Sequence, residues 1–536
     1  MRSGYCAGQR RFNWHSAALR LLEGNLAMTP FLAMGGPPGR FEGLHGVDYA
    51  AILLYLAAVV LLGYTFSRRQ SDTEEYFLAG RNMPWFAVGL SLLASILSTI
   101  TYLSHPGEII KHGLGANSQL LSYPIVFLLV GYLVVPFLMR LKITSAYECL
   151  ERQFDLSTRL FGATIFVLIR LAWMGTIVFT AAGALATISG LPFATVVLGV
   201  AAVGTVYTTL GGIRAVIWTD VVQFFILLAG ALFTIAYVAL DAGTGPLTWY
   251  GQMAAADMEP QPLFSLDPTV RLTWFGMILW TLFWWICTAA GDQVAVQRYL
   301  STGSEASARR SFACNLTASV VITLLLSLCG MALYSYYQTH LPADTDSVFP
   351  HFIGHVLPRG LAGLVVAALF SAAMSSLDSG INSISSVIIT DYYRRLRTVA
   401  VTPRGELKLA RAVTVAAGVA AIMICFLLDS IPDDQRGNLF DLTGRISSFL
   451  VGTLGAMMFL AILKVPASGR AVIVSALAGM SAGLVWAQGH WLFGLPRLAW
   501  MWVIPVSSLI TFGSALVLSR ICPARTRERS NQEFVE

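Results

Sequence analysis

Residues 91–107 read SLLASILSTITYLSHPG and lie in an apolar block that begins near residue 84. A block of about 20 apolar residues has the length of a membrane-spanning helix. This block is unusual because it is dense in Ser and Thr and ends in Pro-Gly. Its pattern predicts a discontinuous helix that offers backbone carbonyls to a cation and N–H groups to an anion. A hydroxyl-rich packing face between two helices is the alternative.

The rest of the chain has the composition of a polytopic membrane protein. Of its 536 residues, 56% are hydrophobic and 12% are charged, whereas a soluble domain has about 25% charged residues. Apolar blocks separated by short polar connections predict about 13 transmembrane helices in an all-α protein. The composition disfavours a soluble enzyme, a nucleic-acid binder and a disordered scaffold. The net charge of +6 comes from Arg scattered between the blocks, which is not a nucleic-acid patch.

The distribution of basic residues predicts the orientation in a cell membrane. Alternate connections between the apolar blocks are rich in Lys and Arg, and the positive-inside rule places them in the cytoplasm. The opposite connections hold only Lys111, Arg271, Arg359, Arg436 and Arg497. The N-terminus is therefore expected outside the cell and the C-terminus in the cytoplasm.

The two ends flank the expected transmembrane domain, which covers residues 48–520. Residues 1–47 are expected to form an external arm or to include a mis-called gene start, because their several Arg disagree with an external location. Residues 521–536 form a short cytoplasmic tail. The scattered His and Cys residues give no catalytic or metal-binding spacing, so an enzyme is not expected.

A second polar stretch, AAMSSLDSGINSISS at 372–386, interrupts another apolar block. Ser375, Ser379 and Asn382 are spaced to share one helix face. The adjacent hydroxyls of Ser375 and Ser376, with a free carbonyl, are oxygen ligands of the kind that replace the water around a small cation. Ordinary Ser packing between helices is the alternative.

Several further residues are candidates for function at membrane depth. Arg170 is expected near the midplane, where it needs a carboxylate or ligand partner. Its planar fork suits a bidentate carboxylate, and an internal ion pair is the alternative. Asp220 either holds a cation at the cytoplasmic exit or pairs with Arg214. Trp280 and Trp284 either wall a substrate cavity or pack against lipid.

Four segments together resemble the sodium:solute symporter family, over about residues 48–520. They are FLAGRNMPW at 77–85, TSAYECLERQF at 144–154, GGIRAVIWTD at 211–220, and the helix that runs from Ser375 to Asp391. The resemblance implies a fold of the LeuT type. Its two inverted five-helix repeats, with discontinuous helices, would cover about residues 84–241 and 272–463.

The resemblance also implies a coupling ion and its ligands. Na+ would bind the carbonyls of Ala94, Leu97 and Ala372 and the hydroxyls of Ser375 and Ser376. Asp220 would match the family aspartate that is linked to a second cation position or to the exit path. Proton coupling in place of Na+ stays open on the sequence alone, as does the oligomeric state.

The expected substrate is a small organic solute, imported by alternating access between the two repeats. Where sugar carriers face their substrate with amide and acidic groups, the matching positions here are Ile96, Ile100 and Thr101. The run that includes Ser98 and Thr101 is similar to the monocarboxylate and vitamin carriers. Arg170 is similar to the arginine that grips the carboxylate in sialic acid carriers. An organic anion is therefore expected, with a neutral sugar, polyol or amino acid as the alternative.

Overall fold

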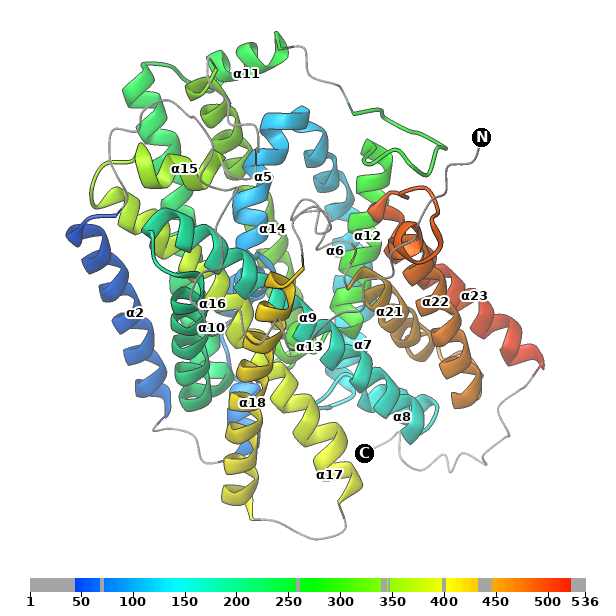
Figure 1. The fold of residues 1–536 in the computed structure, drawn as a ribbon. Helices are drawn as coiled ribbons and strands as arrows, with labels where there is room; N and C mark the ends of the chain where they lie inside the picture. Colours follow the sequence, from blue (N-terminus) through cyan, green and yellow to red (C-terminus); the bar gives the residue numbers. More distant parts are fainter. Residues whose placement is uncertain are drawn as a thin grey trace, which may run out of the picture. The chain divides into compact units, whose positions relative to one another are not determined.

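The computed structural model describes residues 44–67, 72–256, 261–338, 345, 348–397, 402–431, 445 and 447–521, and every element of this part of the chain is helical (Figure 1). Ten of its helices are long and apolar enough to cross a membrane, and two shorter apolar helices accompany them. The all-α membrane fold is thus confirmed, whereas the number of 13 spans stays a prediction. The expected arm and tail lie outside the described residues, apart from 44–47 and Ile521.

The helices follow one another along the chain with short connections. Their bounds are α2 (Gly46–Ser67), α3 (Thr73–Leu78), α4 (Trp85–Ile96), α5 (Thr99–His112), α6 (Tyr123–Leu129), α7 (Val135–Arg140), α8 (Glu148–Gln153), α9 (Leu156–Ser189), α10 (Phe193–Ala242), α11 (Pro246–Ala254), α12 (Trp274–Gly291), α13 (Gln293–Leu300), α14 (Glu305–Tyr336), α15 (Val348–His355), α16 (Leu361–Val387), α17 (Arg394–Leu396), α18 (Pro403–Asp429), α21 (Ser448–Ile462), α22 (Gly469–Phe493) and α23 (Val503–Ile521).

The predicted break in the stretch 91–107 is present. Helix α4 ends at Ile96, and Leu97 and Ser98 then adopt extended backbone with ψ of 97° and 163°. Ser98 starts α5, because its Oγ accepts a hydrogen bond from the backbone N of Thr101 at 3.4 Å. A second break lies between α12 and α13 at Asp292, which has ψ of 117°. Two discontinuous helices therefore place backbone ends inside the helical bundle.

Helix α10 contains a third interruption, at the Gly-Gly pair of the motif at 211–220. Gly212 has φ of 57° and ψ of −165°, a backbone region that only glycine enters without strain. The long element is therefore two helices that meet at Gly212, which agrees with the two apolar blocks of the sequence. The second of them carries Asp220 towards α4 and α16, both of which pack against α10.

Helix α16 is at the centre of the bundle. It packs against α2, α4, α9, α10 and α18, and every residue from Ser371 to Val387 is buried. Its Ala, Ser and Gly residues allow this close approach, since small side chains let membrane helices come together. At Gly380, for example, an added Cβ would lie 2.5 Å from the Sδ of Met174 on α9. The polar stretch 372–386 thus lies where each of its side chains faces protein.

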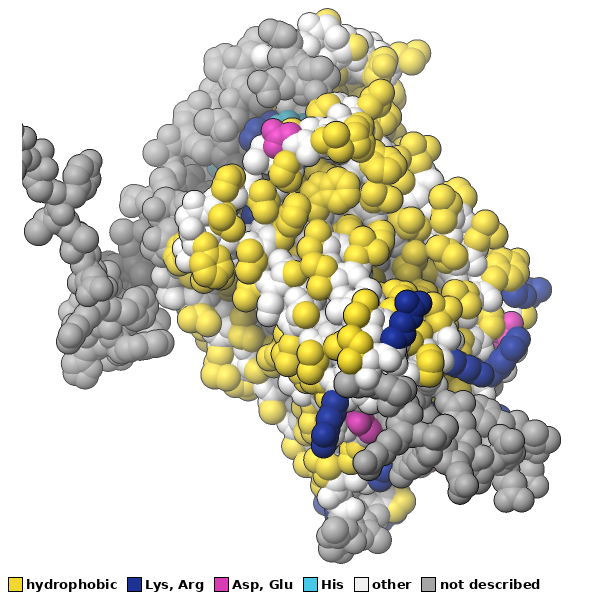
Figure 2. All heavy atoms as spheres, turned by 90° about the vertical axis from the view of Figure 1, so that its right-hand side faces the viewer, with side chains coloured by type: hydrophobic (Ala, Val, Ile, Leu, Met, Phe, Trp, Pro, Cys, Tyr) yellow, Lys and Arg dark blue, Asp and Glu magenta, His cyan; other side chains and the backbone are white. Residues whose placement is uncertain are grey.

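The outer surface has the character expected of a chain in lipid. In Figure 2, apolar side chains cover most of the face that includes α22 and α23, while most of the visible Lys and Arg gather towards the lower end. Among the exposed apolar residues on these helices are Val474, Leu477, Leu509 and Val517. A bilayer is the medium in which such a surface is stable.

A charged cluster ties the end of α16 to α8 and α9. Arg159 Nε donates to Asp391 Oδ1 at 2.7 Å, and its Nη1 donates to Glu151 Oε2 at 2.8 Å. Arg395 Nε also donates to Glu151, at 2.7 Å, and this bond lowers the pKa of the Glu151 carboxyl. Arg159 directly precedes an apolar block, as a loop residue would, yet it is buried and ion-paired.

Asp48 connects α2 to the beginning of α16. Its Oδ1 accepts hydrogen bonds from the backbone N of Gly360 at 2.7 Å and of Gly363 at 2.8 Å. Its Oδ2 accepts from the backbone N of His45 at 2.9 Å. The carboxylate is only 1% exposed. It therefore satisfies N–H groups at a helix start, where a negative charge is also favoured by the helix dipole.

We expect Asp48→Ala to lower the free energy of unfolding by about 1–3 kcal/mol, because buried N–H groups lose their acceptor. The measurement is the thermal unfolding of the purified protein in detergent. Glu74→Ala is the matched control, since Glu74 forms only an exposed pair with Arg81 at 3.3 Å. Equal melting temperatures for the two variants would contradict the anchoring role of Asp48.

Candidate functional site

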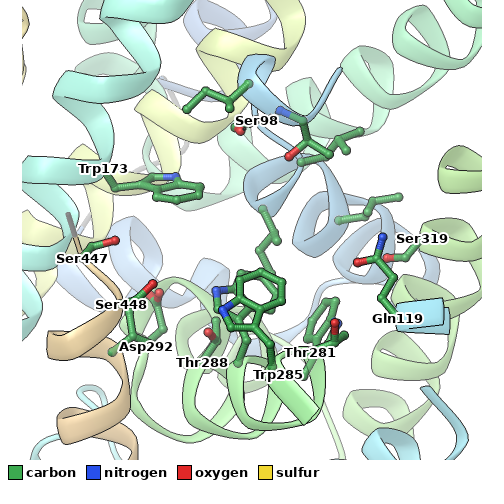
Figure 3. A pocket seen from close by; sticks show the side chains of 18 of the residues that line it. Ser98, Gln119, Trp173, Thr281, Trp285, Thr288, Asp292, Ser319, Ser447 and Ser448 are labelled. Carbon is green, nitrogen blue, oxygen red and sulfur yellow. Dashed lines mark hydrogen bonds between the residues drawn. The ribbon is translucent and has the colours of Figure 1, made fainter. Parts of the chain in front are cut away.

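A cavity of about 180 Å³ lies next to the break between α4 and α5 (Figure 3). Its wall comes from α4, α5, α6, α9, α12, α14 and α21, together with the short helices η2 (Gly113–Ser122) and η6 (Trp500–Trp502). In Figure 3, Ser98 and Trp173 lie across the cavity from Trp285 and Thr288. Both broken helices reach this space, because Ser98 and Asp292 line it.

All five residues that the sequence predicts to bind substrate line this one cavity. They are Ser98, Thr101, Arg170, Trp280 and Trp284. They come from three elements that are far apart in sequence, α5, α9 and α12. Trp280 and Trp284 therefore face a cavity, as the first of their two interpretations requires. What the cavity binds stays a prediction at this point.

Arg170 has an internal partner as well as a place in the cavity wall. Its Nε donates to Asp292 Oδ1 at 3.2 Å, and its Nη2 forms a second bond to Asp292 Oδ2. Asp292 also caps α13, since its Oδ1 accepts from the backbone N of Val294 at 2.9 Å. The internal ion pair is therefore present, whereas the binding of a substrate carboxylate by Arg170 stays a prediction.

The oxygen atoms of the expected cation site converge between α4 and α16. Ser375 Oγ lies 2.8 Å from the carbonyl of Ala94 and 3.3 Å from the carbonyl of Ala372. Ser376 Oγ lies 3.1 Å from the carbonyl of Ser95, one residue further along. Because α4 ends at Ile96, these α4 carbonyls belong to its last turn and have no helical partner.

This donor set fits a small hard cation. The atoms are neutral oxygens, and Ala94, Ala372, Ser375 and Ser376 are all buried. Leu97 lies at the break itself and also lines the cavity. The expected site and the cavity therefore both adjoin the break, and Leu97 is the residue that belongs to both.

Asp220 lies in a second buried polar cluster, next to the first. Its Oδ2 accepts from Ser91 Oγ at 2.6 Å, from Ser95 Oγ at 3.2 Å and from Arg298 Nη2 at 2.9 Å. The expected pairing with Arg214 is wrong, because Arg214 Nε pairs with Glu75 at 2.8 Å. Asp220 bonds Arg298 instead, which is fully buried although it follows an apolar block as a loop residue would.

Asp378 brings a second carboxylate into this cluster. It accepts from Tyr207 OH through Oδ2 and from Ser379 Oγ through Oδ1 at 3.2 Å. Ser379 Oγ also accepts from Arg298 Nη2 at 2.6 Å. Asp220 thus bonds the Arg298 guanidinium directly, whereas Asp378 is linked to it through Ser379. The other oxygen of Asp220, Oδ1, is buried and has no hydrogen-bond partner within the described part of the chain.

Comparison with known proteins identifies the family to which the chain belongs. The profile of the sodium:solute symporter family matches residues 76–483. The chain belongs to this family. A sodium/sialic acid symporter of Proteus mirabilis is 31% identical to it over 459 residues, which cover 83% of this chain and 90% of that protein.

Solved structures agree on the fold of the symporter. A Na+-coupled sialic acid symporter in a substrate-bound, outward-open state has a TM-score of 0.80 at 29% identity, over 90% of this chain and 99% of the other. Mhp1, a nucleobase-cation-symport-1 family transporter, has a TM-score of 0.56 at 14% identity, over 83% and 94% of the two chains. The LeuT-type fold expected from the sequence is confirmed.

Sequence reasoning missed several residues of the symporter's polar centre and cavity. Arg298 looked like a loop charge because it follows an apolar block, and Tyr207 carried no polar pattern. Trp173 and Trp500 line the cavity from α9 and η6, yet single tryptophans in apolar helices give no signal of function. Asp292 was expected only as a tie at a helix end, and its place in the cavity wall depends on tertiary packing.

We expect Arg298→Met to destabilise the symporter by about 3–5 kcal/mol, because it leaves Asp220 charged, buried and unpaired. The measurement is the melting temperature by fluorescence-detected gel filtration. Arg298→Met combined with Asp220→Asn is the matched control, and it should recover most of the loss because the buried charge is gone. If Arg298→Met melted at the same temperature as the unmodified protein, the ion pair would not stabilise the fold.

Proposed function

We propose that this symporter imports a small organic anion, driven by Na+, by alternating access across the cell membrane. The observation that carries the proposal is the break between α4 and α5, where one short segment borders two sites. Ala94 contacts Ser375 on the cation side, while Leu97 and Ser98 line the cavity. Two ligands that order the same segment assist each other's binding, and this coupling is reciprocal.

The two half-helices favour opposite charges. The carboxyl end of α4 presents carbonyl oxygens to the cation position, and the amino end of α5 presents N–H groups at the cavity. A helix carries about half a negative charge at its carboxyl end and half a positive charge at its amino end. A cation and an anion placed in these two positions would therefore each meet a favourable field.

Arg170 supports an anionic substrate over a neutral one. It is a cation at the cavity wall with its Nη1 end available, and a guanidinium binds a carboxylate by paired hydrogen bonds. The relatives point the same way, since the Proteus mirabilis symporter and the structure with a TM-score of 0.80 are both described as carriers of sialic acid. A carboxylate is the group that such a substrate shares with other organic acids.

The orientation is part of the proposal. An external N-terminus and a cytoplasmic C-terminus follow from the basic connections, which include Arg140, Arg152 and Arg394. We assign residues 48–520 to the transmembrane domain, with repeats at about 84–241 and 272–463. Na+ and the anion would then bind from outside, and rocking of one repeat against the other would open the inner side.

We expect Ser375→Ala to raise the half-saturating Na+ concentration at least tenfold, which corresponds to about 1.4 kcal/mol. The reason is the loss of a hydroxyl ligand beside the carbonyls of Ala94 and Ala372. The measurement is Na+-dependent thermal stabilisation of the purified protein. Ser507→Ala is the control, since Ser507 lies on α23 outside the cavity wall and bonds its own helix at Val503. An unchanged Na+ dependence in Ser375→Ala would place the cation elsewhere.

Arg170 is tested with its partner, because removal of the arginine alone would leave Asp292 unpaired. We expect Arg170→Met combined with Asp292→Asn to fold, to keep Na+-dependent stabilisation, and to lose anion uptake at least a hundredfold, about 2.7 kcal/mol. Asp292→Asn alone should keep measurable uptake. Normal anion uptake by the double variant would make the pair purely structural.

The decisive experiment for the proposed function is uptake into proteoliposomes under a Na+ gradient. A labelled organic acid such as sialic acid or a short monocarboxylate is competed with unlabelled organic acids and with glucose. Competition by organic acids supports the proposal, and competition by glucose alone overturns it. Current recordings add the stoichiometry, because one Na+ with one monoanion moves no net charge, whereas each extra Na+ gains about 2.3 kcal/mol per 100 mV.

A further inference from the structure

The cavity wall is rich in tryptophan. Five indoles line it: Trp173 of α9, Trp280, Trp284 and Trp285 of α12, and Trp500 of η6. We call these five residues the tryptophan wall. Trp280 and Trp284 are stacked, with ring centroids 6.0 Å apart and an interplanar angle of 22°. Trp500 meets Trp280 edge-on at 5.1 Å. Trp284 also meets Trp285 edge-on at 5.1 Å, so these four indoles hold one another in place and present extended flat apolar surfaces.

Donors in this wall lack acceptors. The Nε1 atoms of Trp173 and Trp280 and the Oγ1 of Thr281 are buried, and none has a hydrogen-bond partner among the described residues. A buried donor without a partner costs about 1–3 kcal/mol. An indole N–H can only donate. Both nitrogens are closed to water in this structure, so a bound acceptor reaches them only if the indole rings turn towards the cavity.

The size of the cavity limits the molecule. Its volume of about 180 Å³ is slightly larger than that of an engineered apolar cavity of about 150 Å³ that binds benzene. More than half of the lining side chains are apolar, and Ile96 and Ile100 stand among them. A polyhydroxylated sugar acid carries many hydroxyls that each need a partner. A single flat ring with one acidic group matches both the volume and the lining.

We propose that the substrate is a monocyclic aromatic carboxylate, whose ring packs on the tryptophan wall and whose oxygens meet the Nη1 end of Arg170 and the indole N–H groups. This inference rests on the proposed import of an organic anion and narrows its substrate class. It separates this symporter from relatives described as sialic acid carriers by the ring faces of the wall, although hydroxyl side chains such as those of Ser98, Thr101 and Ser448 also line the cavity.

Binding to the full-length purified protein tests the inference without interference from diffusion of the acid through lipid. Radiolabelled benzoate is the probe, measured by scintillation proximity in Na+ and in choline. Unlabelled cyclohexanecarboxylate, benzamide, sialic acid and glucose are the competitors. We expect Na+-dependent benzoate binding. Benzamide should compete at least tenfold more weakly than unlabelled benzoate because it lacks the charge, and sialic acid should also compete more weakly.

Two substitutions at Trp280 distinguish the contribution of the aromatic ring to binding from that of the indole N–H group. Trp280→Phe keeps an aromatic face and removes the N–H group, and Trp280→Ala removes both. We expect the affinity for benzoate to fall about threefold to tenfold in Trp280→Phe and further in Trp280→Ala, in line with the energies of hydrogen bonds and aromatic pairs. Trp491→Phe is the matched control, since Trp491 is 62% exposed and lies outside the cavity wall. Na+-dependent stabilisation checks that each variant is folded.

The outcomes distinguish this inference from the proposed function. Tight sialic acid binding with no benzoate binding overturns the aromatic substrate and leaves organic-anion symport intact. Binding of glucose with neither acid overturns both. Benzoate binding that is unchanged in both Trp280 variants overturns the role of the tryptophan wall. Absence of benzoate binding in a protein that Na+ stabilises also counts against the inference, whatever else the cavity accepts.

Discussion

The fold of the symporter depends on how a few backbone carbonyls inside the membrane find hydrogen-bond partners. A helix that stops at Ile96 leaves the carbonyls of its last turn without helical partners, and in hydrocarbon each such group costs several kcal/mol. The hydroxyls of Ser375 and Ser376 meet two of these carbonyls, from Ala94 and Ser95. This need explains why α16 is central, thoroughly buried and rich in Ser. Three of these oxygens, the Ala94 carbonyl and the two hydroxyls, are also among those proposed to hold Na+.

Two of the buried arginines are also paired with carboxylates inside the bundle. Arg298 bonds Asp220, Ser91 and Ser379 at once, so it joins α13, α4, α10 and α16 in one cluster. Arg170 and Asp292 form a separate pair at the cavity wall. One ion pair thus lies on the cation side of the broken helix and one on the substrate side. The proposed coupling of the two ligands would pass through the segment from Leu97 to Ser98, which lines the cavity and follows the last turn of α4.

Much of this architecture could be predicted from the sequence, for identifiable reasons. The break near Ser98 and the polar face of 372–386 stand out because hydroxyl-rich residues interrupt apolar blocks, and Gly211-Gly212 marks the turn within α10. The partners of the charged residues could not be predicted in this way. Arg298 and Arg159 follow or precede apolar blocks as loop residues do, and only tertiary packing shows that both are buried. Single indoles such as Trp173 give no periodic signal, so the composition of the cavity wall became visible only in three dimensions.

The tryptophan wall and the proposed cation ligands come from different elements. The indoles belong to α9, α12 and η6, whereas the oxygens belong to α4 and α16. Substitutions in one set can therefore accumulate while the other stays unchanged. An ancestral carrier could change its substrate through substitutions in α9, α12 and η6 and keep the proposed Na+ ligands in α4 and α16. The same division offers protein engineers a route to new imported compounds, since the wall can be varied while the proposed cation ligands are kept.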